Sequence, residues 1–250
     1  HPYLVQCYGA VIDPAERRLA IVLELIEGQS LDAFMRQASA TLTLSARYDI
    51  ILCSCRALCY LHSQTPKIVH GDVKSRNVLI EIKSSGVYAK LVDFGLSRLL
   101  TRNARGQGGT LAWMDPELYH DPQPKLSSDI FSFGRLSYFV TTGIRPLPGK
   151  SKAAIEQLLK SGALPALEWP GLSPMEEHCQ LCVKNCSIVP GKLRPSIEQL
   201  HQEVGSWPID SAIDSRGCPN TWSEGVNMLH RKWDPQMNVK KSSVNIKEGI

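Results

Sequence analysis

Residues 67–82 read KIVHGDVKSRNVLIEI and place polar side chains between two apolar runs. Asp72, Lys74 and Asn77 fall within this stretch, directly before the apolar, strand-forming run at residues 78–80. The apolar runs predict strands, and a loop carried by a rigid scaffold keeps its side chains in fixed relative positions. We therefore interpret this loop as the centre of a functional site.

A second acidic residue follows another predicted strand. Asp93 lies in KLVDFGLSR, where an apolar run ends in an acid, and a glycine follows shortly after. Asp93 and the amide oxygen of Asn77 are hard ligands that suit Mg2+. Asp72 is then free to accept a proton from an attacking hydroxyl, and Lys74 to neutralise a phosphoryl group in transfer. Phosphoryl transfer requires this division of roles.

The order and spacing of these residues resemble the protein-kinase superfamily. Residues 70–77, HGDVKSRN, are similar to the catalytic loop H-R-D-L-x-x-x-N, residues 93–95 match D-F-G, and residues 115–117, DPE, are similar to A-P-E. The stretches DVKSRN and GTLAWMDPE look most like the tyrosine-kinase-like serine/threonine group. The resemblance covers residues 1–204, and it implies an enzyme that transfers the γ-phosphoryl group of ATP to serine and threonine hydroxyls of proteins.

The resemblance also implies a role for each matched residue. Asp72, Lys74 and Asn77 would be catalytic, while Asn77 and Asp93 would hold Mg2+ beside the phosphates of ATP. The structural residues would be His70, Phe94, Gly95, Glu117, Asp129 and Arg194, and the activation-loop hydroxyls would be those of Ser97, Thr101 and Thr110.

Three packing contacts are implied in the same way. Asp129 would hydrogen-bond the backbone of the catalytic loop, and Arg194 would form a buried ion pair with Glu117. Cys7 would stack with the histidine of the catalytic loop and the phenylalanine of D-F-G, as members of the regulatory spine.

The early strands would supply the nucleotide contacts. On the implied alignment Leu23 is the gatekeeper, and Glu24, Leu25 and Ile26 form the hinge whose backbone hydrogen-bonds adenine. Leu79 would close the adenine pocket from below.

The expected fold is α+β and protein-kinase-like: a mainly helical large lobe joined to the last two strands and the hinge of a small β lobe. Residues 1–27 would form the partial small lobe, 28–204 the large lobe, and 205–250 a loosely ordered tail. Helices are expected at 44–62, 128–142, 151–161, 174–185 and 196–204, and strands within the first thirty residues and at 78–80 and 89–92.

The sequence departs from the family pattern in three ways. No G-x-G-x-x-G loop, lysine of the third strand or helix-C glutamate is found, and the chain begins at His1. We expect it to be part of a longer protein and to have little or no kinase activity alone. Gly71 replaces the arginine that pairs with a loop phosphate. Asp115 replaces alanine, and it either favours basic substrates or faces water.

Composition narrows the partners. The net charge is +4 and the basic residues are scattered, so we expect no nucleic acid, and no apolar run is long enough for a membrane segment. We expect a cytoplasmic protein, or the cytoplasmic part of a larger membrane protein. The spacing of Cys179, Cys182 and Cys186 beside His178 is compatible with a zinc knot. It is also one face of a helix, and buried thiols are the preferred interpretation.

Two functions from different classes remain open. The first is a serine/threonine protein kinase whose substrates are proteins. The alternative is a catalytically inactive kinase-like module, or pseudokinase, that binds partners or acts as a scaffold. Retention of Asp72, Asn77 and Asp93 favours the enzyme, because a binding module does not need all three.

Overall fold

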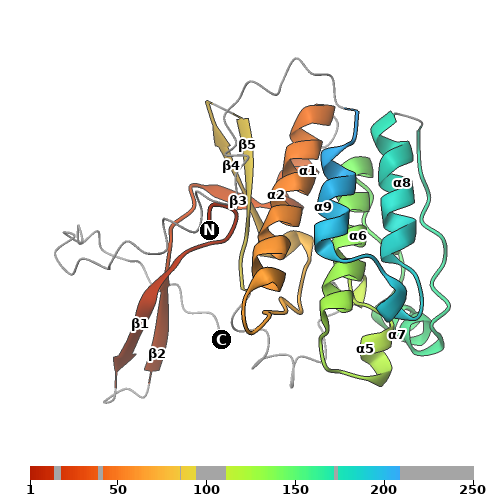
Figure 1. Ribbon diagram of the computed structural model, residues 1–250, viewed down its shortest axis with the longest axis horizontal. Coiled ribbons are helices and arrows are strands. Elements are labelled where there is room, and N and C mark those ends of the chain that lie inside the picture. Colours follow the sequence, from red (N-terminus) through yellow and green to blue (C-terminus); the bar gives the residue numbers. More distant parts are fainter. Residues whose placement is uncertain (14–17, 39–41, 85, 94–110, 172–173, 209–250) are drawn as a thin grey trace. The chain divides into compact units, whose positions relative to one another are not determined.

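The computed structural model describes residues 1–208 except 14–17, 39–41, 85, 94–110 and 172–173. All of these residues belong to one unit, His1–Arg216. The order of elements is a strand hairpin, a three-stranded sheet that is interrupted by two helices, and then a set of helices (Figure 1).

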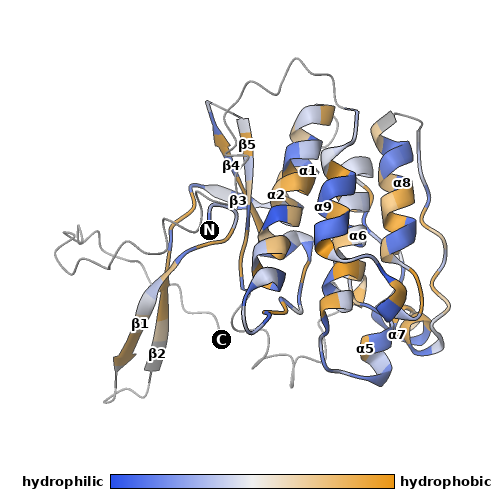
Figure 2. Ribbon diagram, in the orientation of Figure 1, coloured by the Kyte–Doolittle hydropathy of each residue, from blue (hydrophilic) through white to orange (hydrophobic). Residues whose placement is uncertain are grey.

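The hairpin consists of β1 (Cys7–Asp13) and β2 (Arg18–Leu23), which pair antiparallel. These are the two strands expected near the start of the chain. Apolar side chains of both strands are exposed, among them Val11 at 57% and Ile12 at 72%, neighbours that point to opposite faces. Figure 2 shows this hydrophobic character along both strands. The chain before β1 is tied to the second sheet, because Val5 N donates to Leu91 O over 3.0 Å.

The second sheet has the order β3-β4-β5 and is antiparallel throughout. Its strands are β3 (Gly28–Ser30), β4 (Val78–Lys83) and β5 (Gly86–Leu91). The sequence prediction missed β3 and the helix that follows it, α1 (Leu31–Ala38). Gly28 is required for the pairing: a Cβ at this position would lie 2.0 Å from Ile80 O.

The long helix α2 (Leu44–Ser63) packs against β5, α6 and α9. Its first turn is capped by Thr43, whose hydroxyl oxygen accepts a hydrogen bond from Ala46 N over 3.2 Å, as expected for an N-cap. Arg47 reaches from the first turn of α2 to the end of the helix α6, where its guanidinium donates to the carbonyls of Val140 and Thr141. Burial lowers the pKa of Arg47.

The central helix α6 (Leu126–Thr142) is buried along almost its whole length, as its sequence predicted. It ends at Gly143, which adopts φ 75°, a conformation that glycine reaches without steric cost. The remaining helical elements are η1 (Ser75–Asn77), α5 (Glu117–His120), α7 (Lys152–Ser161), α8 (Pro174–Cys186), η2 (Gly191–Leu193) and α9 (Ile197–Gly205).

The observed elements bear out the α+β class, and the helix predictions agree with the structure to within one or two residues at each end. Cys179, Cys182 and Cys186 are fully buried on one face of α8, and burial raises the pKa of the Cys186 thiol. Their arrangement is that of core thiols. Among the described residues no helix is long and apolar enough to cross a membrane.

Candidate active site

The loop before η1 is held by one carboxylate of the buried helix α6. Asp129 accepts hydrogen bonds from the backbone N–H groups of His70 and Gly71, each over 2.8 Å, and its Oδ2 lies 2.9 Å from His62 Nε2. The expected contact between Asp129 and this loop is therefore present. Gly71 has φ 78°, so the residue type that departs from the family pattern is one that fits the backbone here.

The side chains of Asp72, Lys74 and Asn77 converge on one point. Asn77 Nδ2 donates to Asp72 Oδ2 over 3.0 Å and to Asp72 O over 2.9 Å, and Lys74 Nζ forms an ion pair with Asp72 Oδ2. Both hydrogen bonds use the amide nitrogen of Asn77. Its amide oxygen, Oδ1, accepts no hydrogen bond within the described part of the chain. That oxygen is available to a cation.

Backbone hydrogen bonds bring Asp93 to the same place. Val92 N donates to Asn77 O over 2.9 Å, and His70 Nε2 lies 2.9 Å from Val92 O. Asp93, the next residue, is exposed and adopts φ 63°, an uncommon conformation for a residue with a side chain. The two carboxylates and the amide expected to act together are therefore close to one another.

His70 is fully buried, and burial lowers its pKa, although the charges of Asp129, Asp72 and Asp93 act in the opposite direction. The imidazole is thus neutral near pH 7. Asp72 N donates to Nδ1 over 3.2 Å, so Nδ1 is the acceptor and Nε2 carries the proton donated to Val92 O. His70 links the two acidic segments through this tautomer.

The expected hinge follows β2. Leu23 is 43% exposed. Glu24 N donates to Gln6 O over 2.8 Å, and the Glu24 carboxylate pairs with Lys90 Nζ. Burial raises the pKa of Glu24, but Lys90 and the N–H of Gln6 more than offset this and leave it below its usual value. Leu79 pairs across β4 and β5 with Lys90, so the two side chains share a face of the sheet.

Two backbone groups of the expected hinge have no hydrogen-bond partner in the part of the chain that the structure describes. Ile26 O accepts from Gly28 N over 2.9 Å, whereas the carbonyl of Glu24 and the N–H of Ile26 make no hydrogen bond among the residues described. A neighbouring acceptor and donor of this kind match the edge of a purine ring.

A comparison with protein-family models adds to this geometry. Residues 1–204 match the model described as protein tyrosine and serine/threonine kinase. The chain belongs to the protein kinase family.

Curated relatives of this kinase domain come from plants and other eukaryotes. A U-box domain-containing protein 70 of Oryza sativa subsp. japonica is 32% identical over 231 residues, which are 85% of this chain and 27% of the relative. The L-type lectin-domain containing receptor kinase V.9 of Arabidopsis thaliana is 34% identical over 71% of this chain and 27% of the relative. The serine/threonine-protein kinase CTR1 of the same plant is 32% identical over 72% and 22%. The kinase domain thus spans about a quarter of the length of these relatives.

Several predicted positions of the kinase domain are not placed. Five of them lie outside the described residues, and their expected roles stay predictions: Phe94, Gly95, Ser97, Thr101 and Thr110. Cys7, expected to stack with His70 and the phenylalanine of D-F-G, is exposed in β1, and its thiol lies 3.7 Å from Gly9 O.

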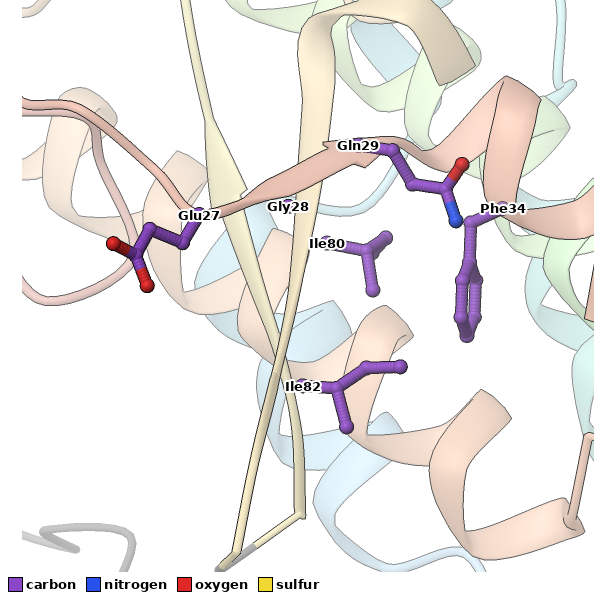
Figure 3. A pocket seen from close by; sticks show the side chains of 6 residues that line it. All are labelled: Glu27, Gly28, Gln29, Phe34, Ile80 and Ile82. Carbon is purple, nitrogen blue, oxygen red and sulfur yellow. The ribbon is translucent and has the colours of Figure 1, made fainter.

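A pocket of about 320 Å³ lies beside the expected hinge, but on the other face of β4 (Figure 3). Ile80, Ile82 and Phe34 gather around it in Figure 3, and Glu27, Gly28 and Gln29 complete its lining. Side chains alternate along a strand, so Leu79 points away from this pocket. The pocket is therefore separate from the expected adenine site.

The ion pair expected between Arg194 and Glu117 needs correction. Arg194 binds Asp115 with both terminal nitrogens, the Nη2–Oδ1 distance being 3.1 Å, and both side chains are fully buried. The ion pair with Glu117 is present but longer, at 3.9 Å from Arg194 Nη2, and the Glu117 side chain is 31% exposed rather than buried. Glu117 also accepts a hydrogen bond from Gly191 N. Asp115 thus neither faces water nor contacts a substrate, because its carboxylate neutralises a buried guanidinium.

Asp32 is a residue that the sequence prediction missed. It is 3% exposed at the start of α1 and accepts a hydrogen bond over 3.2 Å from Ser75 Oγ, which lies in η1 of the expected catalytic loop. Its carboxylate also forms ion pairs with Arg36 and Arg145. An acidic residue in the first turn of a helix is common on protein surfaces, so nothing in the local sequence marks Asp32 as buried.

Proposed function

We propose that the chain forms the large lobe and hinge of a serine/threonine protein kinase, which transfers the γ-phosphoryl group of ATP to serine or threonine hydroxyls of proteins. The observation that carries this proposal is the convergence of the Asp72, Lys74 and Asn77 side chains on one point, beside the backbone of the segment that carries Asp93. His70 and Asp129 hold these two segments together.

The roles follow from the contacts. Asp72 is fixed by the amide of Asn77, so its carboxylate can orient a substrate hydroxyl and accept its proton. Lys74 lies against that carboxylate, and its ammonium can also neutralise charge on the phosphoryl group. A lysine two residues after the catalytic aspartate supports serine and threonine as acceptors.

The donor set fits Mg2+. Asn77 Oδ1 and the exposed carboxylate of Asp93 are hard oxygen ligands on adjacent segments. Mg2+ takes few ligands from protein and completes its shell with phosphate and water. A group of three or more His, Cys, Asp or Glu side chains could hold a metal ion without a substrate, but no such group occurs among the described residues. The set of Asn77 and Asp93 is of a different kind, because it depends on phosphate and water for the remaining ligands. Bound Mg2+ would neutralise phosphate charge.

The hinge fits ATP. The carbonyl of Glu24 and the N–H of Ile26, which have no hydrogen-bond partner among the described residues, can bind the adenine edge, with Leu79 below the ring and Leu23 as gatekeeper. Residues 1–27, 28–204 and 205–250 would then be the partial small lobe, the large lobe and a tail. The names of relatives, which include a receptor kinase, support a cytoplasmic protein or the cytoplasmic part of a membrane protein.

Turnover of Mg-ATP with a generic protein substrate tests this function. In the complete product of the gene we expect phosphorylation of serine or threonine, and Asp72→Asn should lower kcat by about 10²- to 10⁴-fold. The 250-residue chain alone is expected to turn over little ATP, because its sequence has no glycine-rich phosphate loop. ATP binding by the complete product without any transfer would favour the pseudokinase instead.

A further inference from the structure

On the surface beside the expected catalytic loop, two positively charged side chains share one negatively charged partner. One carboxylate, that of Asp32, is shared by two guanidiniums, those of Arg36 and Arg145. Neither arginine has another ion-pair partner within the described ranges, so the three side chains together keep a charge of one positive unit. Arg76, which follows Ser75, is exposed and adds a further cation that forms no ion pair with any described residue.

The carboxylate of this group is buried, whereas its two arginines are exposed. The Asp32 side chain is 4% exposed, whereas Arg36 is 63% and Arg145 47% exposed. Burial alone would raise the pKa of Asp32, yet Arg145 and Arg36 lower it below its usual value, so the carboxylate stays ionised. A buried anion therefore fixes two guanidiniums whose remaining N–H donors face solvent. A guanidinium has five such donors, and an acidic group can bind two at once.

The position of this pair suits a substrate. Ser75 Oγ donates to Asp32, and Ser75 lies three residues after Asp72. Three residues span at most about 11 Å between Cα atoms. The contact of Ser75 with Asp32 therefore places the two guanidiniums next to the loop that carries Asp72. An extended peptide advances about 3.3 Å per residue. A side chain within about five residues of the acceptor can reach them.

We propose that Arg36 and Arg145 form a specificity site that binds an acidic or phosphorylated side chain of the substrate near its acceptor hydroxyl. This inference rests on the proposed kinase function, since it names the substrate class of that site. Asp32 acts as a positioning residue, because it holds both guanidiniums and the catalytic loop through Ser75.

Equilibrium binding tests the site without requiring catalysis. Three fluorescein-labelled peptides with a central serine are titrated with the 250-residue chain at low salt. Their flanking residues are glutamine, glutamate, or glutamine with one phosphoserine. We expect the glutamate and phosphoserine peptides to bind about tenfold more tightly than the glutamine peptide, a preference that falls as salt is added. The phosphoserine and glutamate arms decide which anion is preferred.

Single substitutions locate the effect. Arg36→Gln and Arg145→Gln are made separately, because removing both would leave the buried Asp32 carboxylate without a cation. Each should reduce the preference for the charged peptides about threefold. Lys160→Gln and Lys184→Gln are matched controls, since both lysines are exposed at the last turns of other helices, and they should leave the preference unchanged.

The outcomes separate this site from the proposed function. Equal binding of all three peptides, or an equal loss in the lysine controls, would overturn the specificity site even where the complete protein phosphorylates serine. Absence of phosphate transfer in the complete protein, with the charge preference intact in binding, would overturn the kinase function alone. Circular dichroism of each variant shows whether the fold is kept. If a glutamine variant proves unstable, Arg145→Lys is used in its place. This substitution preserves the charge and should retain much of the preference for charged peptides.

Discussion

At the scale of single residues, the backbone at Asp93 restricts which side chains the position accepts. Its φ of 63° is tolerated by asparagine and aspartate better than by most residues. Stability and cation binding can therefore be separated at this position.

Asp93→Asn should keep the stability of the chain but lose the Mg2+-dependent part of ATP binding. Asp93→Ala should lose the same binding and also about 1 kcal/mol of stability, because a Cβ without a polar side chain is strained at positive φ. Urea denaturation measures the stability, and thermal shifts with ATP at varied Mg2+ measure the binding. Unchanged Mg2+ dependence in Asp93→Asn would remove Asp93 from the metal site.

The buried pair between Asp115 and Arg194 gives a second prediction. Asp115→Ala leaves a fully buried guanidinium without its bidentate partner and should cost about 3 kcal/mol. Glu117→Ala removes mainly a hydrogen bond from Gly191 N and should cost about 1 kcal/mol. Chemical denaturation of both variants checks the order. The reverse order would show that Glu117, as first expected, is the main partner of the arginine.

At the scale of elements, the pairing of β3 with β4 depends on the absence of a side chain at Gly28. Gly28→Ala would place a Cβ 2.0 Å from Ile80 O, so the two strands must separate, and the loss should exceed about 2 kcal/mol. Gly205→Ala is the control, since nothing lies within 4 Å of a Cβ there. Comparable denaturation midpoints for the two variants would contradict this account of β3.

The elements that the sequence predicted are those with a local signal. α2 and α6 have apolar patterns and caps that lie within or beside the helix, and the catalytic loop has its residues within one short stretch. Asp32 was missed because its partner Arg145 is 113 residues away. The choice between Asp115 and Glu117 depends on which of two acids points inward, and Arg194 is 79 residues from Asp115. Such long-range contacts have no signature in the spacing of residues.

At the scale of the whole molecule, the β1–β2 hairpin leaves apolar side chains exposed on both faces. Val11 and Ile12 are examples, and such patches favour association between copies. Val11→Lys/Ile12→Lys should therefore lower the apparent mass of the 250-residue chain in light scattering at high concentration.

The matched control for the hairpin is Val189→Lys, because Val189 is 65% exposed and lies far from β1 in the sequence, near η2. It should leave the apparent mass unchanged. If the hairpin variant associates as strongly as the wild type, the hairpin is not the surface through which copies meet.

The two acids near Arg194 also have a consequence for how this protein can change over generations. Asp115 holds the guanidinium, while Glu117, two positions along, stands 3.9 Å from the same group. A lineage that loses Asp115 pays in stability but still has an acid beside the guanidinium, so later substitutions nearby can bring Glu117 closer and repair the loss. Redundancy of this kind lets neighbouring positions drift while the fold that they support stays the same.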